Sequence, residues 1–298
     1  MTKSLFICLI LLCIGFNTFA NRIDDLKTDA DVIKFINSLH ISNDKLRLAT
    51  LGEIINRHCH VSVPQSITTW KKADFNNDGR SDLIAIASVD GSQIINLVVI
   101  DTGNNNFKYF VINYSLAFQC EFITTVSQKK QQLLLFHKAN FSYDVKAPVK
   151  DETIDTLIYN FNAFIEQNRH PANYHIKYVV LRSSPCFGTC PVQELDIYKT
   201  GEVRYLGGRY SKKQGTFRSK INQAKLDSLV NFINYLDIMQ LKNSYAVDWT
   251  DSPTCYLTVA FDDGSVKNIS DYGERGTFGL RTLYDMVWGF IPSQNWSK

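Results

Sequence analysis

The sequence predicts an α+β protein. Two N-terminal helices and an antiparallel β region are expected first, followed by a C-terminal two-layer domain of order β-β-β-α-β-β-α. Aromatic residues make up 12% of the 298 residues, which favours strands. Short apolar runs alternate with Gly, Asn and Asp turn signals, and a few segments have the apolar spacing of amphipathic helices. Apolar residues at 45% and charged residues at 20% exclude wholesale disorder, collagen-like repeats and coiled coil.

Residues 1–20 have the pattern of a cleaved signal peptide. Lys3 precedes the apolar run Leu5–Gly15, and Thr18-Phe19-Ala20 supplies a small-residue cleavage site before Asn21. The run is too short for a membrane span, which needs about 20 apolar residues, and no other stretch could cross a bilayer. We therefore expect an exported protein, in the periplasm or at the extracellular or cell surface. A lipoprotein is the weaker interpretation, because Leu12 precedes Cys13 where lipid attachment requires a small residue.

The first expected domain, residues 21–170, begins with helices over about Asp29–Leu39 and Asn43–His58. Both segments carry apolar side chains at helical spacing, and Ser42 or Asn43 can cap the second. A β-rich region follows, with turn signals such as Asp90-Gly91 between the apolar runs. The expected strands cover residues 83–89, 94–100, 107–112, 118–125, 132–137 and 156–164.

A polar segment over residues 167–173, which includes Pro171, is interpreted as the boundary to a second domain, residues 171–298. Strands are expected over 176–181, 192–198, 203–206, 254–261 and 265–269. Helices are expected over 223–236 and 278–291. This order favours both helices on one face of a sheet.

One loop has the residue types of a calcium site. Asp74, Asn76, Asp78 and Asp82 place carboxylate or amide oxygens at relative positions 1, 3, 5 and 9. A glycine at position 6 allows a sharp turn, and the carbonyl of Arg80 can supply the oxygen of position 7. Hard oxygen ligands in this pattern suit Ca²⁺.

This stretch resembles the loop of FG-GAP and VCBS repeats, in which D-x-[DN]-x-D-G-x-x-D leads into a strand. It departs from the EF-hand, because Ala85 stands where that motif needs a glutamate and the following residues are strand-like. Only one copy is found, so a propeller is not expected. The resemblance implies a structural Ca²⁺ with a dissociation constant on the order of 0.1–1 mM. The alternative is an Asp/Asn/Gly-rich turn that holds no metal.

Five cysteines remain after signal cleavage, so at least one thiol would be unpaired or intermolecular. Cys186 and Cys190 flank a Phe-Gly-Thr turn that can bring their Cα atoms within about 7 Å, which favours a disulfide. A redox pair usually has C-x-x-C spacing, and a metal site would need further ligands, but both stay as alternatives. A bridge between Cys59 and Cys120 is compatible with the sequence and is not fixed by it.

The C-terminal region resembles the bacterial exported family known as domain of unknown function 6438. The resemblance covers about Tyr174–Pro292, and its specific element is Cys186-Phe187-Gly188-Thr189-Cys190-Pro191. One departure is Gln193, where the family usually has an aromatic residue. The resemblance implies an architecture but no reaction. The shorter elements, in the family's order, are Arg182–Val192, Ile197–Gly201, Thr250–Thr254 and Tyr272-Gly273.

No coherent catalytic set stands out in the sequence. Arg182 and Asp251 are candidate binding residues, because an aspartate near the cysteine turn could hold Arg182 or another cation. His170 and His175 precede the cysteines and are interpreted as surface residues. A metal at His58 and His60 is the less favoured interpretation, since no further ligands are fixed by spacing.

These patterns favour an exported, non-enzymatic binding or interaction protein, whose partner is an unknown protein or cell-envelope ligand. A net charge of +3 without a long basic block argues against nucleic acid. The alternative is an envelope enzyme, either a thiol oxidoreductase using Cys186 and Cys190 or a hydrolase. A protease-inhibitor-like module is a third interpretation that rests on architecture alone.

Overall fold

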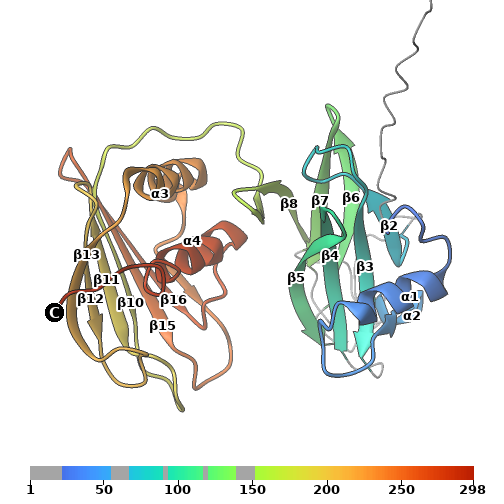
Figure 1. Cartoon of the computed structure of the whole chain (residues 1–298), viewed down its shortest axis with the longest axis horizontal. Helices are drawn as coiled ribbons and strands as arrows, with labels where there is room; N and C mark the ends of the chain where they lie inside the picture. Colours follow the sequence, from blue (N-terminus) through green and yellow to red (C-terminus); the bar gives the residue numbers. More distant parts are fainter. Residues whose placement is uncertain (1–21, 55–66, 90–92, 117–119, 139–151) are drawn as a thin grey trace, which may run out of the picture.

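The computed structural model describes residues 22–54, 67–89, 93–116, 120–138 and 152–298. The description of side chains in this part of the chain leaves out residues 114–116 as well. Strands dominate, and few helices accompany them, so the expected mixed α+β class is confirmed. Figure 1 shows two sheet-containing parts side by side, with helix α4 (Phe278–Trp288) between them.

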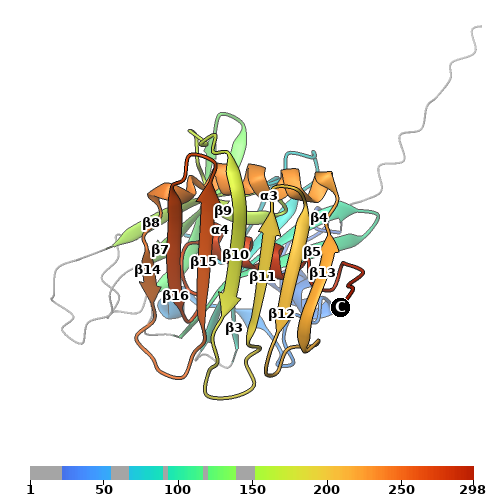
Figure 2. The ribbon, with the colours of Figure 1, turned by 90° about the vertical axis from the view of Figure 1, so that its left-hand side faces the viewer.

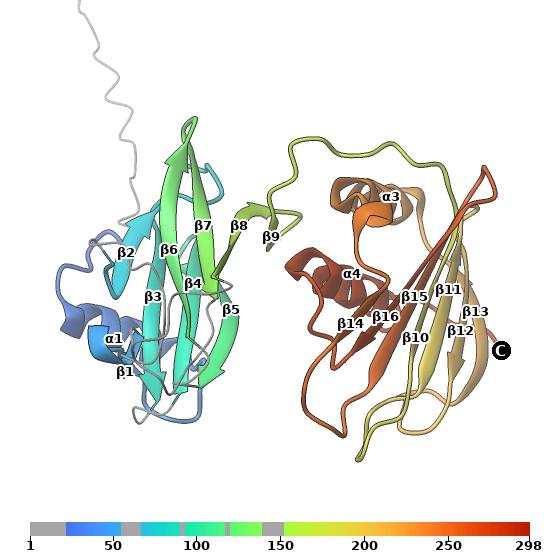
Figure 3. The same ribbon diagram turned by 180° about the vertical axis from the view of Figure 1, so that it is seen from behind.

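The first part contains a five-stranded sheet whose two faces are both covered. Its central strands read as almost continuous apolar runs, because one face packs against helix α1 (Asp29–Ser38) and the other against a second sheet. Thr28 begins α1 with a capping box that involves Asp31. Figure 3 shows α1 beside β3, far from the C-terminal sheet. The strands are β1 (Arg47–Leu48), β2 (Trp70–Ala73), β3 (Asp82–Val89), β4 (Gln93–Gly103) and β5 (Asn106–Leu116), ordered β1-β3-β4-β5 with β2 also on β3.

The second sheet of this part is an antiparallel meander, β6-β7-β8-β9. Its apolar side chains, such as Phe122 and Leu134, share a core with Ile84 and Val98 of the five-stranded sheet. A tight turn at Phe161 and Asn162, both with positive φ, separates its last two strands. The strands are β6 (Glu121–Gln128), β7 (Gln131–Lys138), β8 (Thr153–Asn160) and β9 (Ala163–Glu166).

The C-terminal part is a seven-stranded sheet with helices on one face only. Its order is β13-β12-β11-β10-β15-β16-β14, antiparallel except where β14 pairs with β16. Figure 2 looks onto the uncovered face, while α3 and α4 lie behind it, toward the first part. The strands are β10 (Ile176–Ser183), β11 (Gln193–Tyr198), β12 (Glu202–Gly207), β13 (Gly215–Lys220), β14 (Ser244–Ala246), β15 (Thr254–Phe261) and β16 (Val266–Tyr272).

Helix α3 (Gln223–Leu236) and α4 bury one apolar stripe each against this sheet. Asn222 caps α3 by accepting a hydrogen bond from the backbone of Lys225, and Asp237 ends the helix in a left-handed conformation. The 3₁₀ helix η1 (Ile238–Gln240) then leads toward β14. No helix among the described residues is long and apolar enough to cross a membrane.

Three sequence expectations need correction. The helix expected over Asn43–His58 is wrong for its first half, because Arg47–Leu48 pairs with Ser88 and Ala87 as a strand. Only Leu51–Ile54 is helical (α2), and the residues after it lie outside the described part. The strand expected over 156–164 is two strands, β8 and β9. The order expected for the C-terminal domain leaves out two strands of the structure, β13 and β14, and the expectation for the first part leaves out β2.

Candidate functional site

The calcium-type loop connects β2 to β3 and is held by its own hydrogen bonds. Asp74 accepts from the backbone N–H groups of Asp78 (3.2 Å) and Gly79 (2.9 Å), and Asn76 accepts from Asp78 (3.2 Å). Gly79 has a φ of 82°, the left-handed conformation that the sharp turn requires. The carboxylate of Asp78 is contacted by the Arg80 guanidinium and by the amide of Asn76.

Asp82, the first residue of β3, is fully buried beside the loop. Its carboxylate accepts from the backbone N–H groups of Phe75 (2.8 Å) and Asp101 (2.9 Å), which ties the loop to β4. Burial raises its pKa to about 7, and the charges of Asp78 and Asp74 contribute in the same direction. The donor chemistry of this loop suits Ca²⁺. However, no three His, Cys, Asp or Glu side chains of the described residues are arranged to hold a metal ion.

The disulfide between Cys186 and Cys190 is present, with a Cα–Cα distance of 5.6 Å. It closes the turn between β10 and β11 and leaves Phe187 87% exposed at the tip. The only described histidine near β10, His175, precedes the strand, whereas the cysteines follow it. An eight-residue strand separates them by about 25 Å, so the imidazole of His175 does not stand near this pair as a base.

The two other described cysteines, Cys120 and Cys255, are not arranged as nucleophiles. Cys255 is buried in the core, and burial, together with the nearby Glu274 carboxylate at 3.2 Å, raises the pKa of its thiol far above the usual range. Cys120 takes part in a disulfide. Cys59 lies outside the described residues, and so do His58 and His60.

Arg182 and Asp251 are not paired. The guanidinium of Arg182 lies over the ring of Tyr256, its cross-strand partner, at 4.8 Å from the ring centre on the uncovered face of the sheet. Asp251 instead uses its backbone carbonyl to accept from the N–H of Phe187 at 3.3 Å, and its side chain accepts from Thr250. Asp251 therefore helps to hold the disulfide turn in place. Among the ion pairs of the described residues, none joins Asp251 to Arg182.

One hydroxyl–imidazole–carboxylate row occurs in the first part. Thr124 Oγ1 lies 2.8 Å from His137 Nε2, and His137 Nδ1 lies 3.8 Å from Glu152. Burial lowers the pKa of His137, which stacks on the ring of Phe122 and is 2% exposed. The imidazole is thus enclosed in the core of the first part.

The two parts of the molecule meet at the first turn of α4. Both carboxylate oxygens of Glu166, the last residue of β9, accept backbone N–H groups there: Phe278 at 2.6 Å and Gly279 at 2.8 Å. The rings of Phe136 and Phe278 also meet edge to face, with centres 5.3 Å apart. A carboxylate on a helix N-terminus is favourable, since it satisfies free N–H donors and complements the helix dipole.

Beside this contact lies a cavity of about 490 Å³ lined by residues of both parts. Its wall includes four basic side chains and three acidic ones. A volume in this range is typical of small-molecule sites, which often occur where two units meet. The basic residues are Lys138, Lys242, Arg275 and Arg281, the acidic ones Glu121, Asp155 and Glu166, and the aromatic ones Phe136, Tyr245, Trp249 and Phe278.

Comparison with protein families locates this cavity relative to a known module. Residues 177–291 match the model of the domain of unknown function DUF6438. This confirms the resemblance predicted for about Tyr174–Pro292. No curated protein matches the chain. The DUF6438 region contains Arg275, Arg281 and Phe278, whereas Glu166, Phe136 and Glu121 precede it, so the cavity lies between this module and the preceding sheet.

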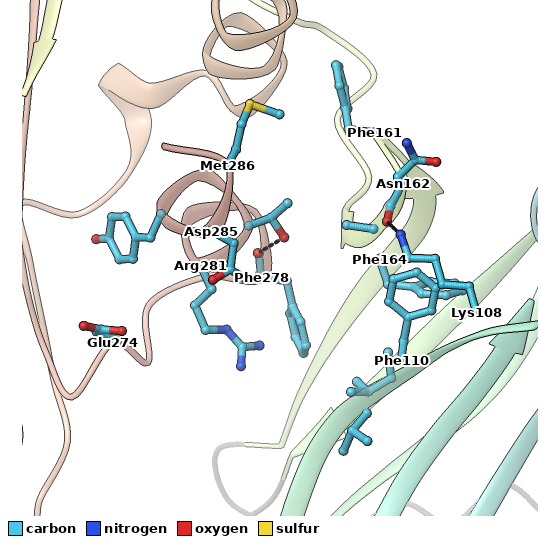
Figure 4. A pocket seen from close by; sticks show the side chains of 15 residues that line it. Lys108, Phe110, Phe161, Asn162, Phe164, Glu274, Phe278, Arg281, Asp285 and Met286 are labelled. Atoms are coloured by element: carbon cyan, nitrogen blue, oxygen red, sulfur yellow. Dashed lines mark hydrogen bonds between the residues drawn. The ribbon is translucent and has the colours of Figure 1, made fainter. Parts of the chain in front are cut away.

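Arg281 of the DUF6438 region lines this cavity from helix α4. Its Nε atom is buried and has no hydrogen-bond partner among the described residues, and its guanidinium lies 4.4 Å from the centre of the Phe278 ring. Burial lowers the pKa of this guanidinium, and the nearby charge of Arg275 lowers it further. Figure 4 shows Arg281 projecting from α4 beside Phe278, at the edge of a second cavity.

That second cavity, of about 660 Å³, lies on the other side of Arg281. Lys108 and Phe110 line it from the first part, and Glu274 and Asp285 from the DUF6438 region (Figure 4). The ammonium group of Lys108 donates to the backbone carbonyl of Asn162 at 2.7 Å, so it binds a neighbouring residue of the cavity wall.

Sequence reasoning missed Glu166, Arg275 and Arg281. Arg281 lies in a helix where only the apolar spacing carried a signal, and Arg275 lies in a loop without a motif. Nothing in the sequence indicates that Glu166 reaches a helix that begins at Phe278.

Proposed function

We propose that this protein is an exported, non-enzymatic binding protein that holds its ligand in the cavity between β9 and the DUF6438 region. The observation that carries the proposal is this cavity of about 490 Å³, whose walls come from both parts. Glu166 and the Phe136–Phe278 contact set the distance between the walls. A site that is already formed loses little free energy to ordering when a ligand binds.

Neither the described cysteines nor the buried histidine row offers an accessible nucleophile with a base beside it, which supports a binding role. The thiol of Cys255 is buried, and the imidazole of His175 does not stand near the Cys186–Cys190 disulfide. The row of Thr124, His137 and Glu152 is the arrangement that a hydrolase would most readily use. None of these three residues lines either junction cavity, and the imidazole is enclosed.

Export is proposed on the pattern of residues 1–20 alone. Intact-mass measurement of the protein from its native host should give a chain that begins at Asn21, and fractionation should place it outside the cytoplasm. A full-length chain in the cytoplasm would contradict export without affecting the proposed binding site.

Calcium binding by the loop is proposed as a second, structural property. Beyond the larger effect of burial, the carboxylates of Asp74 and Asp78 lie close enough to Asp82 to raise its pKa further, and Arg80 is the only basic side chain paired with Asp78 among the described residues. A cation would offset this repulsion. Its role would be to brace the β2–β3 connection, and no chemistry is assigned to it.

Ligand binding at the junction can be tested by a fragment screen of residues 21–298 with saturation-transfer NMR. The panel should contain neutral, anionic and cationic aromatic compounds. The variant Val247→Trp fills the cavity from its wall, and Val266→Trp is the matched control, since Val266 is 46% exposed on β16 away from the cavity. We expect hits that persist in Val266→Trp and disappear in Val247→Trp. Hits that survive both changes, or a panel without hits, would refute the junction site.

A further inference from the structure

Two guanidinium groups at the junction cavity have no acidic partner. Neither Arg275 nor Arg281 forms an ion pair within the described part of the chain. Both line the cavity. Burial raises the pKa of Glu121 on the same wall, and the charges of Arg275 and Arg281 partly oppose this increase, so both guanidinium groups lie near that carboxyl. Arginine placed in this way is suited to bind a carboxylate with two parallel hydrogen bonds.

Four of the nearby carboxylates are already engaged with other groups. Glu166 accepts from the first turn of α4, and Asp271 accepts from the backbone N–H groups of Arg275 (3.0 Å) and Gly276 (2.9 Å). Asp155 is paired with Lys138 at 2.8 Å, and Glu121 is contacted by the amide of Asn113. None of these carboxylates forms an ion pair with Arg275 or Arg281, although the charges of Glu166, Asp271 and Asp285 favour the charged form of Arg281.

The position of Arg281 is unfavourable without a further partner, whereas Arg275 is exposed to solvent. Arg281 is largely withdrawn from water, its Nε has no acceptor among the described residues, and the charge of Arg275 disfavours its charged form, which Glu166, Asp271 and Asp285 offset only in part. The contact with the Phe278 ring offsets part of this cost but accepts no hydrogen bond. A buried polar group that lacks a partner in a folded protein calls for an explanation, and an external anion provides one.

We propose that the cavity binds a small organic monoanion, whose carboxylate accepts hydrogen bonds from Arg275 and Arg281. This inference rests on the proposed function and specifies its ligand class. Four basic and three acidic side chains line the cavity, so the formal excess is one positive charge, which matches one carboxylate better than a phosphate dianion. The apolar part of the ligand packs against Phe136 and Phe278, with Trp249 at the rim.

Two sources of such a carboxylate are distinguished by matched probes. The first pair is 1-naphthoate and its neutral amide, which represent a free aromatic acid. The second pair is the tripeptide Gly-Gly-Phe and its C-terminal amide, which represent a peptide end. Binding to residues 21–298 is measured by isothermal titration calorimetry, and the side-chain Nε–H signal of Arg281 is followed by NMR.

The variants are Arg275→Gln and Arg281→Gln, with Arg218→Gln on the edge strand β13 as the matched control. We expect at least one acid to bind, its amide to bind at least tenfold more weakly, and each cavity variant to lose about ten- to a hundredfold in affinity. Arg218→Gln should bind like the unchanged protein, and the Arg281 signal should shift with the acid. Circular dichroism and melting curves check that each variant is folded.

The possible failures are distinct. If acid and amide bind equally and Val247→Trp abolishes both, the junction site stands and the anion inference is wrong. If Arg275→Gln and Arg281→Gln bind the acid as well as the control does, the inference is wrong even where the acid is preferred. If neither acid binds, the inference is also wrong.

Discussion

Glu166 caps the helix that begins at Phe278, although 112 residues separate them in the sequence. The last residue of the first part thus supplies the acceptor for the backbone N–H groups of Phe278 and Gly279. Gly279 permits this approach, because a Cβ there would lie 3.2 Å from the carboxylate and 2.3 Å from Leu236. The contact makes the position of α4, and of Arg281 on it, depend on β9.

Replacing Glu166 with alanine should weaken the junction. Two charge-assisted hydrogen bonds are lost, and two N–H donors stay unsatisfied, so we expect the free energy of unfolding to fall by about 1–2 kcal/mol. Glu166→Gln should lose less, because one oxygen still accepts. Urea unfolding measures the change, and Glu202→Ala, at an exposed strand position, is the control. Equal effects of Glu166→Ala and Glu202→Ala would show that the cap contributes nothing.

Replacing Arg281 with methionine should abolish ligand binding without lowering the stability of the fold. A desolvated guanidinium without a partner costs free energy in the unliganded protein, and an apolar side chain of similar length removes that cost. We expect an unchanged or higher melting temperature in Arg281→Met, together with loss of 1-naphthoate binding. A melting temperature lowered by more than about 5 °C would indicate that Arg281 holds the fold together.

Removing the Cys186–Cys190 disulfide should have a modest effect. The bond closes a loop of only a few residues, so the chain-entropy model gives at most about 2 kcal/mol. The double variant Cys186→Ser, Cys190→Ser should stay folded, with changes confined to the turn around Phe187 and Asp251. Insulin reduction tests the oxidoreductase alternative. Activity in the unchanged protein that disappears in the double variant would support a redox role instead.

Asp82 should make stability depend on pH in a definite direction. Its pKa is about 7 in the folded protein and near 3.8 in the unfolded chain, so the folded state holds an extra proton between these values. The free energy of unfolding therefore falls as pH rises from about 4 to 7, and the loss is complete above 7. In EDTA, we expect the decrease from pH 5 to pH 8 to be larger in the unchanged protein than in Asp82→Asn, by on the order of a few kcal/mol. Parallel curves would mean that Asp82 titrates normally.

Calcium bound by the loop should restore part of the free energy of unfolding that is lost as the pH rises. At about ten times its dissociation constant, Ca²⁺ would add roughly 1.4 kcal/mol of stability at pH 7.5. Melting curves in 10 mM Ca²⁺ and in EDTA measure this for the unchanged protein, for Asp78→Ala and for Asp44→Ala, an exposed control. We expect the increase to disappear only in Asp78→Ala. No increase in the unchanged protein, or an equal increase in all three, would leave the loop as a metal-free turn.

The sequence predicts best those elements whose packing requires a regular pattern of apolar residues along the chain. β3 reads as a continuous apolar run because both of its faces are buried, and α3 was placed over its exact range because its stripe is regular. The edge strands Trp70–Ala73 and Gly215–Lys220 were missed because their polar side chains resemble loops. The strand at Arg47 was taken for helix because its pairing with Ser88 is a tertiary contact.

The candidate site was beyond sequence reasoning for a different reason. Glu166, Arg275 and Arg281 acquire their roles only when two separately patterned regions pack together. If the two parts of the chain did not touch, these three charged residues would be ordinary surface residues. The disulfide turn, in contrast, is local, and its two cysteines predicted it correctly.

Hydrogen–deuterium exchange of residues 21–298, with and without saturating 1-naphthoate, tests the junction site most directly. We expect the ligand to slow exchange in both walls at once, in β7 and β9 on one side and in the first turns of α4 on the other, and to leave β12 and β13 unchanged. Protection confined to one part of the molecule, or located on the uncovered face of the seven-stranded sheet, would contradict a ligand held between the two parts.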